Sequence, residues 1–60
     1  MAWIARDKDN DLYIYTDKPK RDEMWTLWIS INSSFAKLSY NGDKNLIGKT
    51  ITWDDEPIEI

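Results

Sequence analysis

Apolar and polar residues alternate over several short stretches of this chain, which is the pattern of β-strands with two different faces. Residues 2–6 and 12–16 both alternate in this way. The polar run 7–11 between them has the composition of a tight turn. The pattern predicts that these two stretches pair as an antiparallel β-hairpin.

The most extended alternation lies at residues 25–31, where every second residue is apolar. A helix would not place four apolar residues at a strict spacing of two, so this stretch is predicted to be a strand. The residues expected to face the core are Trp25, Leu27, Ile29 and Ile31. The residues expected to face away are Thr26, Trp28 and Ser30.

The remaining stretches predict shorter elements. Residues 37–40, 49–53 and 58–60 alternate as strands, and Asn41-Gly42 is typical of a type I′ hairpin turn. The turn-like residues 32–34 could begin a single helical turn through residues 35–36. Residues 17–23 are expected to form a charged loop, because Pro19 has no amide hydrogen for a central strand.

Together these patterns predict an all-β fold over residues 1–60: one small antiparallel meander or open barrel of about five short strands, with at most one short helical turn. A chain of 60 residues has a marginal core, and without Cys no disulfide can reinforce it. Its eight aromatic rings are the expected replacement. The residues expected in the core are Trp3, Leu12, Ile14, Trp25, Leu27, Ile29, Ile31, Leu38, Tyr40, Ile51 and Trp53.

The chain also resembles a group of small β proteins of phages, prophage regions and gut bacteria that have no assigned activity. The residues that carry the resemblance are Trp3-Ile4-Ala5-Arg6-Asp7-Lys8-Asp9, Leu12-Tyr13-Ile14-Tyr15, Lys18-Pro19, Arg21, Trp28 and Trp53-Asp54-Asp55-Glu56-Pro57-Ile58-Glu59. The chain departs from the group at Asn10, where a glycine is expected. The resemblance implies a phage or mobile-element origin and no particular chemistry.

Composition narrows the classes of function. The net charge of −3 argues against a protein that mainly holds duplex DNA, and the chain has no His to act as a zinc ligand or general base. No stretch is apolar enough for a signal peptide or a membrane span. Together with the lack of Cys, this favours a cytoplasmic protein without a membrane partner.

Two clusters of acidic residues are candidates for a metal-binding or catalytic site. Asp7, Asp9 and Asp11 have the spacing that opens an EF-hand loop, but Leu12 and Lys18 occupy the positions that need Gly and Glu. This cluster is therefore expected to be a solvated turn. The second cluster is expected to be a solubilising turn, because a chain this short has little room for a catalytic cleft; it comprises Asp54, Asp55, Glu56 and Glu59. We expect no catalytic residue, no metal site and no cofactor.

Four apolar residues have the opposite parity to the predicted core: Ile4, Tyr13, Tyr15 and Trp28. A sheet with one solvated face would carry polar residues there. These four apolar residues therefore predict either a binding interface or a second small core within the chain, and the sequence does not decide between the two.

The function predicted from these features is a non-catalytic protein–protein interaction module. It would either associate with itself or be phage-encoded and act on a host protein. The alternative is a module for single-stranded nucleic acid, in which rings stack on bases beside a basic loop. The candidate binding residues for these two functions are Tyr13, Tyr15, Trp28, Lys18, Lys20 and Arg21.

Overall fold

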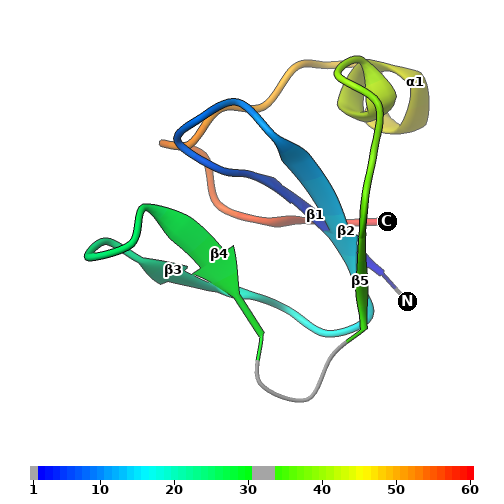
Figure 1. Ribbon diagram of the computed structural model, residues 1–60. Coiled ribbons are helices and arrows are strands. Elements are labelled where there is room, and N and C mark those ends of the chain that lie inside the picture. Colours follow the sequence, from blue (N-terminus) through cyan, green and yellow to red (C-terminus); the bar gives the residue numbers. More distant parts are fainter. Residues whose placement is uncertain (1, 31–33) are drawn as a thin grey trace.

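A computed structural model describes residues 2–30 and 34–60. Their strands form two antiparallel sheets, one of order β5-β2-β1-β6 and one of order β3-β4, with one short helix, α1 (Figure 1). The small all-β fold predicted from the sequence is confirmed. The elements are β1 (Trp3–Arg6), β2 (Leu12–Tyr15), β3 (Lys20–Asp22), β4 (Leu27–Ile29), β5 (Phe35–Lys37), α1 (Gly42–Ile47) and β6 (Ile58–Glu59).

The predicted hairpin is formed by β1 and β2, with Ile4 opposite Ile14 and Arg6 opposite Leu12. Its turn depends on Asn10, whose φ of 76° lies in the left-handed region that favours glycine or asparagine. The Asp9 carboxylate accepts a hydrogen bond from the Asp11 amide at 3.1 Å. The turn predicted at residues 7–11 is confirmed, but Asp7, which was expected to be solvated with it, is buried.

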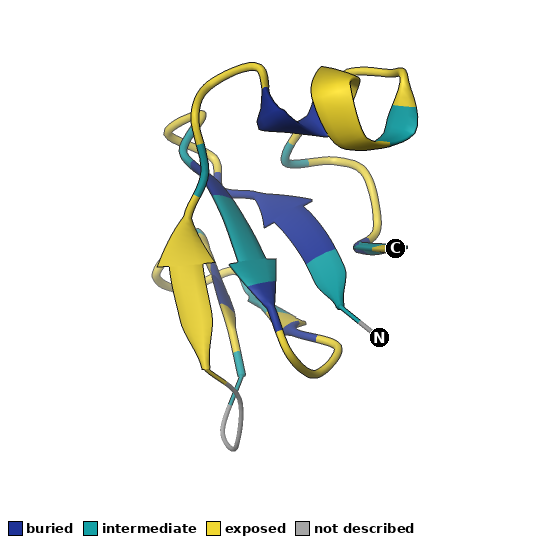
Figure 2. Ribbon diagram, turned by 90° about the vertical axis from the view of Figure 1, so that its right-hand side faces the viewer, coloured by how far each residue is buried: buried dark blue, intermediate teal, exposed yellow. Residues whose placement is uncertain are grey.

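Strands β5 and β6 complete the first sheet on its two edges. The predicted last strand is present as β6, which pairs with β1. Ala2 and Ile60 exchange backbone hydrogen bonds, so the two ends of the chain lie together (Figure 1). Strand β5 is exposed along its length, whereas most of β1 is buried (Figure 2).

The β1–β2 hairpin is buried on both of its faces. On one face Ile4, Leu12 and Ile51 form a core, which the segment from Leu38 to Ile58, including α1, completes. On the other face Ala5, Tyr15 and Trp28 form a second core, covered by the β3–β4 hairpin. The layers are visible in Figure 1, where β3–β4 and α1 lie on opposite sides of the central hairpin.

The orientation predicted for residues 25–31 is wrong. Trp28 is buried at 5% exposure, whereas Trp25, Leu27 and Ile29 are exposed. Ile31 lies outside the described residues. The physical reason is that β4 packs on a second core formed with Ala5 and Tyr15, so its inward face is the one that carries Trp28. Of the two possibilities for the second face, the structure has the small core for Tyr15 and Trp28, whereas Ile4 lies in the first core with Leu12 and Ile51.

Several predicted boundaries are also wrong. Asn41-Gly42 is the start of α1 and not a hairpin turn, while residues 38–40 and 49–53 are not strands. The predicted loop 17–23 contains β3, and the helical turn predicted at residues 35–36 is part of β5. Gly42 allows a close approach, because a Cβ there would lie 3.1 Å from the Leu38 Cβ.

Candidate functional site

Trp28 attaches the β3–β4 hairpin to the central hairpin through three hydrogen bonds. Its backbone amide donates to the Asp7 Oδ1 at 3.0 Å, and its indole N–H donates to the Arg6 carbonyl at 2.9 Å. Its carbonyl accepts a hydrogen bond from the Tyr15 hydroxyl at 3.2 Å. The side chain predicted to face outward is therefore the one that fixes the second core.

Asp7 is buried at 4% exposure, although it follows directly on the end of β1. One carboxylate oxygen accepts the Trp28 amide, and the other accepts no hydrogen bond from a described residue. Among the described residues, no lysine or arginine forms an ion pair with Asp7. Burial raises the pKa of Asp7 above its ordinary value, the Trp28 hydrogen bond opposes this rise, and the charges of Asp9 and Asp11 add to it.

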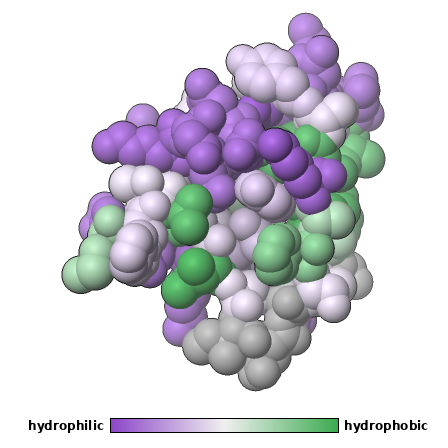
Figure 3. Space-filling model, viewed as in Figure 1, coloured by the Kyte–Doolittle hydropathy of each residue, from purple (hydrophilic) through white to green (hydrophobic). Residues whose placement is uncertain are grey.

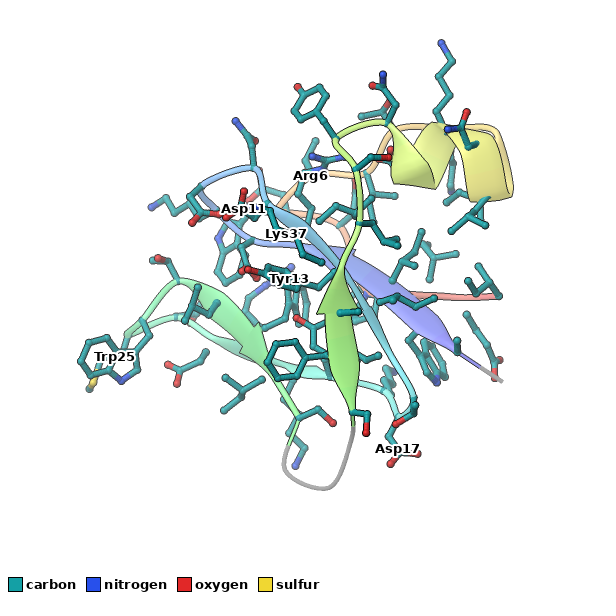
Figure 4. The ribbon with its side chains drawn as sticks, turned by 45° about the vertical axis from the view of Figure 1, so that its right-hand side comes forward. Arg6, Asp11, Tyr13, Asp17, Trp25 and Lys37 are labelled. Atoms are coloured by element: carbon teal, nitrogen blue, oxygen red, sulfur yellow. The ribbon has the colours of Figure 1, made fainter. Side chains whose placement is uncertain are left out.

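Asp7 forms part of the wall of a cavity of about 210 Å³ between the two sheets. The other lining residues are Tyr13, Tyr15, Trp28, Ile29, Ser30 and Phe35. Tyr13 and Phe35 meet edge to face with their centroids 5.9 Å apart, and Tyr15 lies 6.0 Å from Phe35. The Tyr13 side chain extends from β2 toward the β3–β4 hairpin (Figure 4). The arrangement is an aromatic pocket with a buried carboxylate in its wall.

The structure does not bring the three basic candidates together as one free patch. Arg21 lies against the rings of Trp28 and Trp53, with its guanidinium carbon 4.8 and 5.2 Å from their centroids. It also donates to the Trp53 carbonyl at 2.9 Å. Lys18 lies over the Trp3 ring at 5.5 Å, and only Lys20 projects from the surface without a described ring contact.

The outer side of the β3–β4 hairpin is apolar, and this feature was missed because the parity of β4 was inverted. Met24 is 84% exposed and Trp25 is 69% exposed, and both lie in the turn between the two strands. Leu27 and Ile29, which lie on β4, are exposed as well. Figure 3 shows hydrophobic (green) atoms at the surface in the region of this hairpin. We call these four residues the hairpin surface. Trp25 points away from the rest of the molecule (Figure 4).

The hairpin turn holds Met24 and Trp25 in place through its own hydrogen bonds. The Asp22 carboxylate accepts hydrogen bonds from the Met24 amide at 3.0 Å and the Trp25 amide at 3.3 Å. Thr26 completes the turn with φ of 55°, in the left-handed region. The exposed tryptophan is thus presented by a structured turn, which lowers the entropy that a partner would have to remove.

A second buried charge, on the opposite face, was also missed. Arg6 and Asp43 form an ion pair at 3.0 Å and are exposed by 3% and 1%. Arg6 donates further hydrogen bonds to the carbonyls of Asn10, Tyr40 and Ile51. Burial disfavours ionised Asp43, but hydrogen bonds from Ile51, Arg6 and Lys44 prevail and lower its pKa. No feature of the sequence pairs these distant residues.

The acidic residues at the C-terminal end form an exposed turn. The Asp55 carboxylate accepts hydrogen bonds from the Thr52 amide and hydroxyl at 2.8 and 3.3 Å. Asp54 and Glu56 are exposed beside it, and Glu59 is exposed in β6. Within residues 2–30 and 34–60, no group of three or more acidic side chains is arranged to hold a metal ion.

No family model, curated protein or solved structure matches this chain. The only helix of the described residues, α1, is far too short to cross a membrane. The candidate site is therefore defined by geometry alone: the hairpin surface and the aromatic pocket that adjoins it at Ile29.

Proposed function

We propose that this protein is a non-catalytic module that binds another protein through the hairpin surface. The observation that supports this proposal is the exposure of Met24 and Trp25 on a structured turn, next to Leu27 and Ile29 on β4. Tryptophan is enriched among the residues that dominate the free energy of binding at protein interfaces. The partner is a second copy of the chain or, for a protein of phage origin, a host protein in the cytoplasm.

The nucleic-acid alternative has less support. Its stacking platform needs exposed rings, but Tyr15 and Trp28 are buried in the second core. Its basic loop needs cations that are free to contact phosphates. The Arg21 guanidinium instead lies against the rings of Trp28 and Trp53 and donates a hydrogen bond to the Trp53 carbonyl. The interface is therefore proposed on the outer side of the hairpin and not on the face formed by Tyr13, Tyr15 and Trp28.

The proposal is tested by comparing the wild type with Trp25→Ala. Sedimentation equilibrium over a range of concentrations measures self-association, and titration against a purified partner measures binding to a different protein. Such a partner is found by replacing Trp25 with a photoreactive residue and identifying the proteins that it crosslinks. The control carries the same photoreactive residue in place of Asn45, an exposed residue of α1. We expect Trp25→Ala to weaken association about 30-fold or more, as for an interface residue worth about 2 kcal/mol.

Trp25→Ala should leave the fold intact, because the ring contributes little to either core. The proposal is wrong if the protein associates, by either measurement, with the same affinity in the wild type and in Trp25→Ala. It is also wrong if the wild type does not self-associate and the photoreactive residue at position 25 captures no protein beyond those that position 45 captures.

A further inference from the structure

We infer that the aromatic pocket beside the hairpin surface binds an unmodified lysine side chain of the partner protein. This inference rests on the proposed function, since it is the partner that supplies the lysine. It concerns a different part of the surface, however: the cavity between β2, β4 and β5, and not the turn that carries Trp25. Ile29 joins the two, because it belongs to the hairpin surface and also lines the pocket.

The charge of the occupant follows from Asp7. Its carboxylate is the one acidic group among the described residues that line the pocket, and no described cation pairs with it. A buried and uncompensated carboxylate is costly, which is consistent with the raised pKa of Asp7. An anionic occupant would increase this cost, whereas a cation would remove it.

The rings in the pocket wall favour the same charge. Tyr13, Tyr15 and Phe35 lie within 6.4 Å of one another. Trp28 also lines the pocket, but its ring already has the Arg21 guanidinium 4.8 Å away, so the three other rings are the ones left for a cation. The faces of aromatic rings attract a cation within about 6 Å, and this attraction is strongest where water is excluded. Phe35 is exposed and forms the outer rim, so a side chain can enter from the solvent beside β5.

The number of free oxygens selects lysine over arginine. Asp7 Oδ1 already accepts the Trp28 amide, so Oδ2 is the oxygen with both lone pairs free for a ligand. A guanidinium group binds a carboxylate best through two parallel hydrogen bonds, which need both oxygens. An ammonium group is a compact charge that can donate to a single oxygen. A trimethylated lysine has no N–H to donate and would leave this oxygen unpaired.

The pocket is tested with capped amino acids as probes, followed by NMR of the backbone and indole N–H signals of Trp28. The probes are N-acetyl-lysine methylamide, the same compound acetylated at Nζ, its trimethylated form and N-acetyl-arginine methylamide. We expect the lysine probe to shift both Trp28 signals to saturation. The acetylated probe should cause no such shift, because acetylation removes the charge. The arginine and trimethyl-lysine probes should bind more weakly than lysine.

Asp7→Asn is the main variant, because asparagine keeps an oxygen that can accept the Trp28 amide while losing the charge. Asp9→Asn is its matched control, since it removes the same charge from the same turn at an exposed position outside the pocket. We expect Asp7→Asn to weaken lysine binding about tenfold or more, as for the loss of a hydrogen bond to a charged group. Asp9→Asn should change it about twofold at most.

A second pair of variants tests the rings. Phe35→Ala removes the outer rim of the pocket and should weaken lysine binding, whereas Leu46→Ala removes an exposed apolar side chain from α1 and should not. The inference is wrong if the acetylated and unmodified lysine probes give the same shifts, a comparison that needs no variant. It is also wrong if a folded Asp7→Asn binds the lysine probe as tightly as the wild type.

The test separates this inference from the proposed function. Trp25 does not line the pocket, so the lysine probe should bind Trp25→Ala as it binds the wild type. If the probe fails while Trp25→Ala still weakens binding to a protein, only the lysine inference is wrong. If the probe binds at Trp28 while protein association is unaffected by Trp25→Ala, only the hairpin surface is wrongly assigned.

Discussion

The two faces of the β1–β2 hairpin are closed in different ways. On one face the residues around α1 are fixed by the Arg6–Asp43 pair, in which each charge is matched by its partner and by backbone hydrogen bonds. On the other face the β3–β4 hairpin is fixed by Trp28, and among the described residues no lysine or arginine forms an ion pair with the Asp7 carboxylate. The two buried carboxylates therefore have pKa values shifted in opposite directions.

The difference separates a structural site from a candidate binding site. A buried charge pair whose partners are both in the chain has no charge left for a ligand to neutralise. An unpaired carboxylate in an aromatic pocket, by contrast, is stabilised when a cation binds beside it. Met24, Trp25, Leu27 and Ile29 are exposed together on the second side, on the outer surface of the β3–β4 hairpin, whereas Tyr40 and Leu46 are exposed apolar residues on the side of α1. The first face thus serves stability, and the second combines stability with the features expected of an interface.

The largest loss of folding stability is expected from Asp43→Ala. This change leaves Arg6 as an uncompensated buried charge and removes the acceptor of the Ile51 and Lys44 amides. Breaking such a pair costs about 3–5 kcal/mol, which is similar to the whole stability of a domain of this size. The variant should be largely unfolded in a urea titration followed by circular dichroism.

A double variant sharpens the same prediction. Arg6→Met with Asp43→Leu removes both charges, so it should recover part of the stability lost in Asp43→Ala. Recovery is expected to be incomplete, because the backbone amides of Ile51 and Lys44 still lose their acceptor. A single variant as stable as the wild type would show that the pair does not hold this face.

An intermediate effect on the free energy of unfolding is expected from a change of pH, and its sign is opposite for the two buried carboxylates. Both carboxyls have an unfolded pKa near 3.8. Because burial raises the folded pKa of Asp7, its ionised form lowers stability at neutral pH, and this penalty is relieved as the pH falls toward 3.8. Because hydrogen bonds lower the folded pKa of Asp43, its stabilising contribution is present above 3.8 and is lost as the pH falls below it.

The measurement is the unfolding free energy of the wild type and of Asp7→Asn between about pH 7 and pH 3. The groups that interact electrostatically with Asp7 are Asp9, Asp11 and Tyr15, and the charges of the two aspartates raise the pKa of Asp7. Asp9→Asn therefore serves as the control. The stability of the wild type should rise relative to that of Asp7→Asn as the pH falls from neutral toward 4. A constant difference would contradict the assignment of an uncompensated charge to Asp7.

The sequence was sufficient for the parts of the fold that depend on local patterns. The β1–β2 hairpin follows from alternation around a polar turn, and Asn10 meets the backbone requirement of that turn. Strand β6 was likewise visible from its alternation. In these elements neighbouring residues determine the structure, so no knowledge of distant contacts was needed.

The candidate site depends on contacts between distant residues, and this is why it was only partly predicted. Tyr13 and Trp28 were identified as unusual, but β4 has large apolar residues on both faces, and its alternation does not show which face is inside. Asp7 was interpreted as a solvated turn residue because its burial arises from a hairpin 21 positions away. The beginning of α1 at Gly42 similarly reflects close packing against Leu38 and not the local turn pattern.

The smallest effect is expected from Leu27→Ala, and it tests which side of the β3–β4 hairpin faces the core. Leu27 is 38% exposed on the hairpin surface, whereas its neighbour Trp28 is buried in the second core. Surface substitutions usually change stability by about 0.5 kcal/mol or less, so Leu27→Ala should cost under about 1 kcal/mol. Truncating a buried tryptophan costs about 3–5 kcal/mol, so Trp28→Ala should unfold the domain in the same urea titration. If Leu27→Ala instead costs about 2–5 kcal/mol, as for a buried leucine, the hairpin faces the other way and its outer surface is not available to a partner.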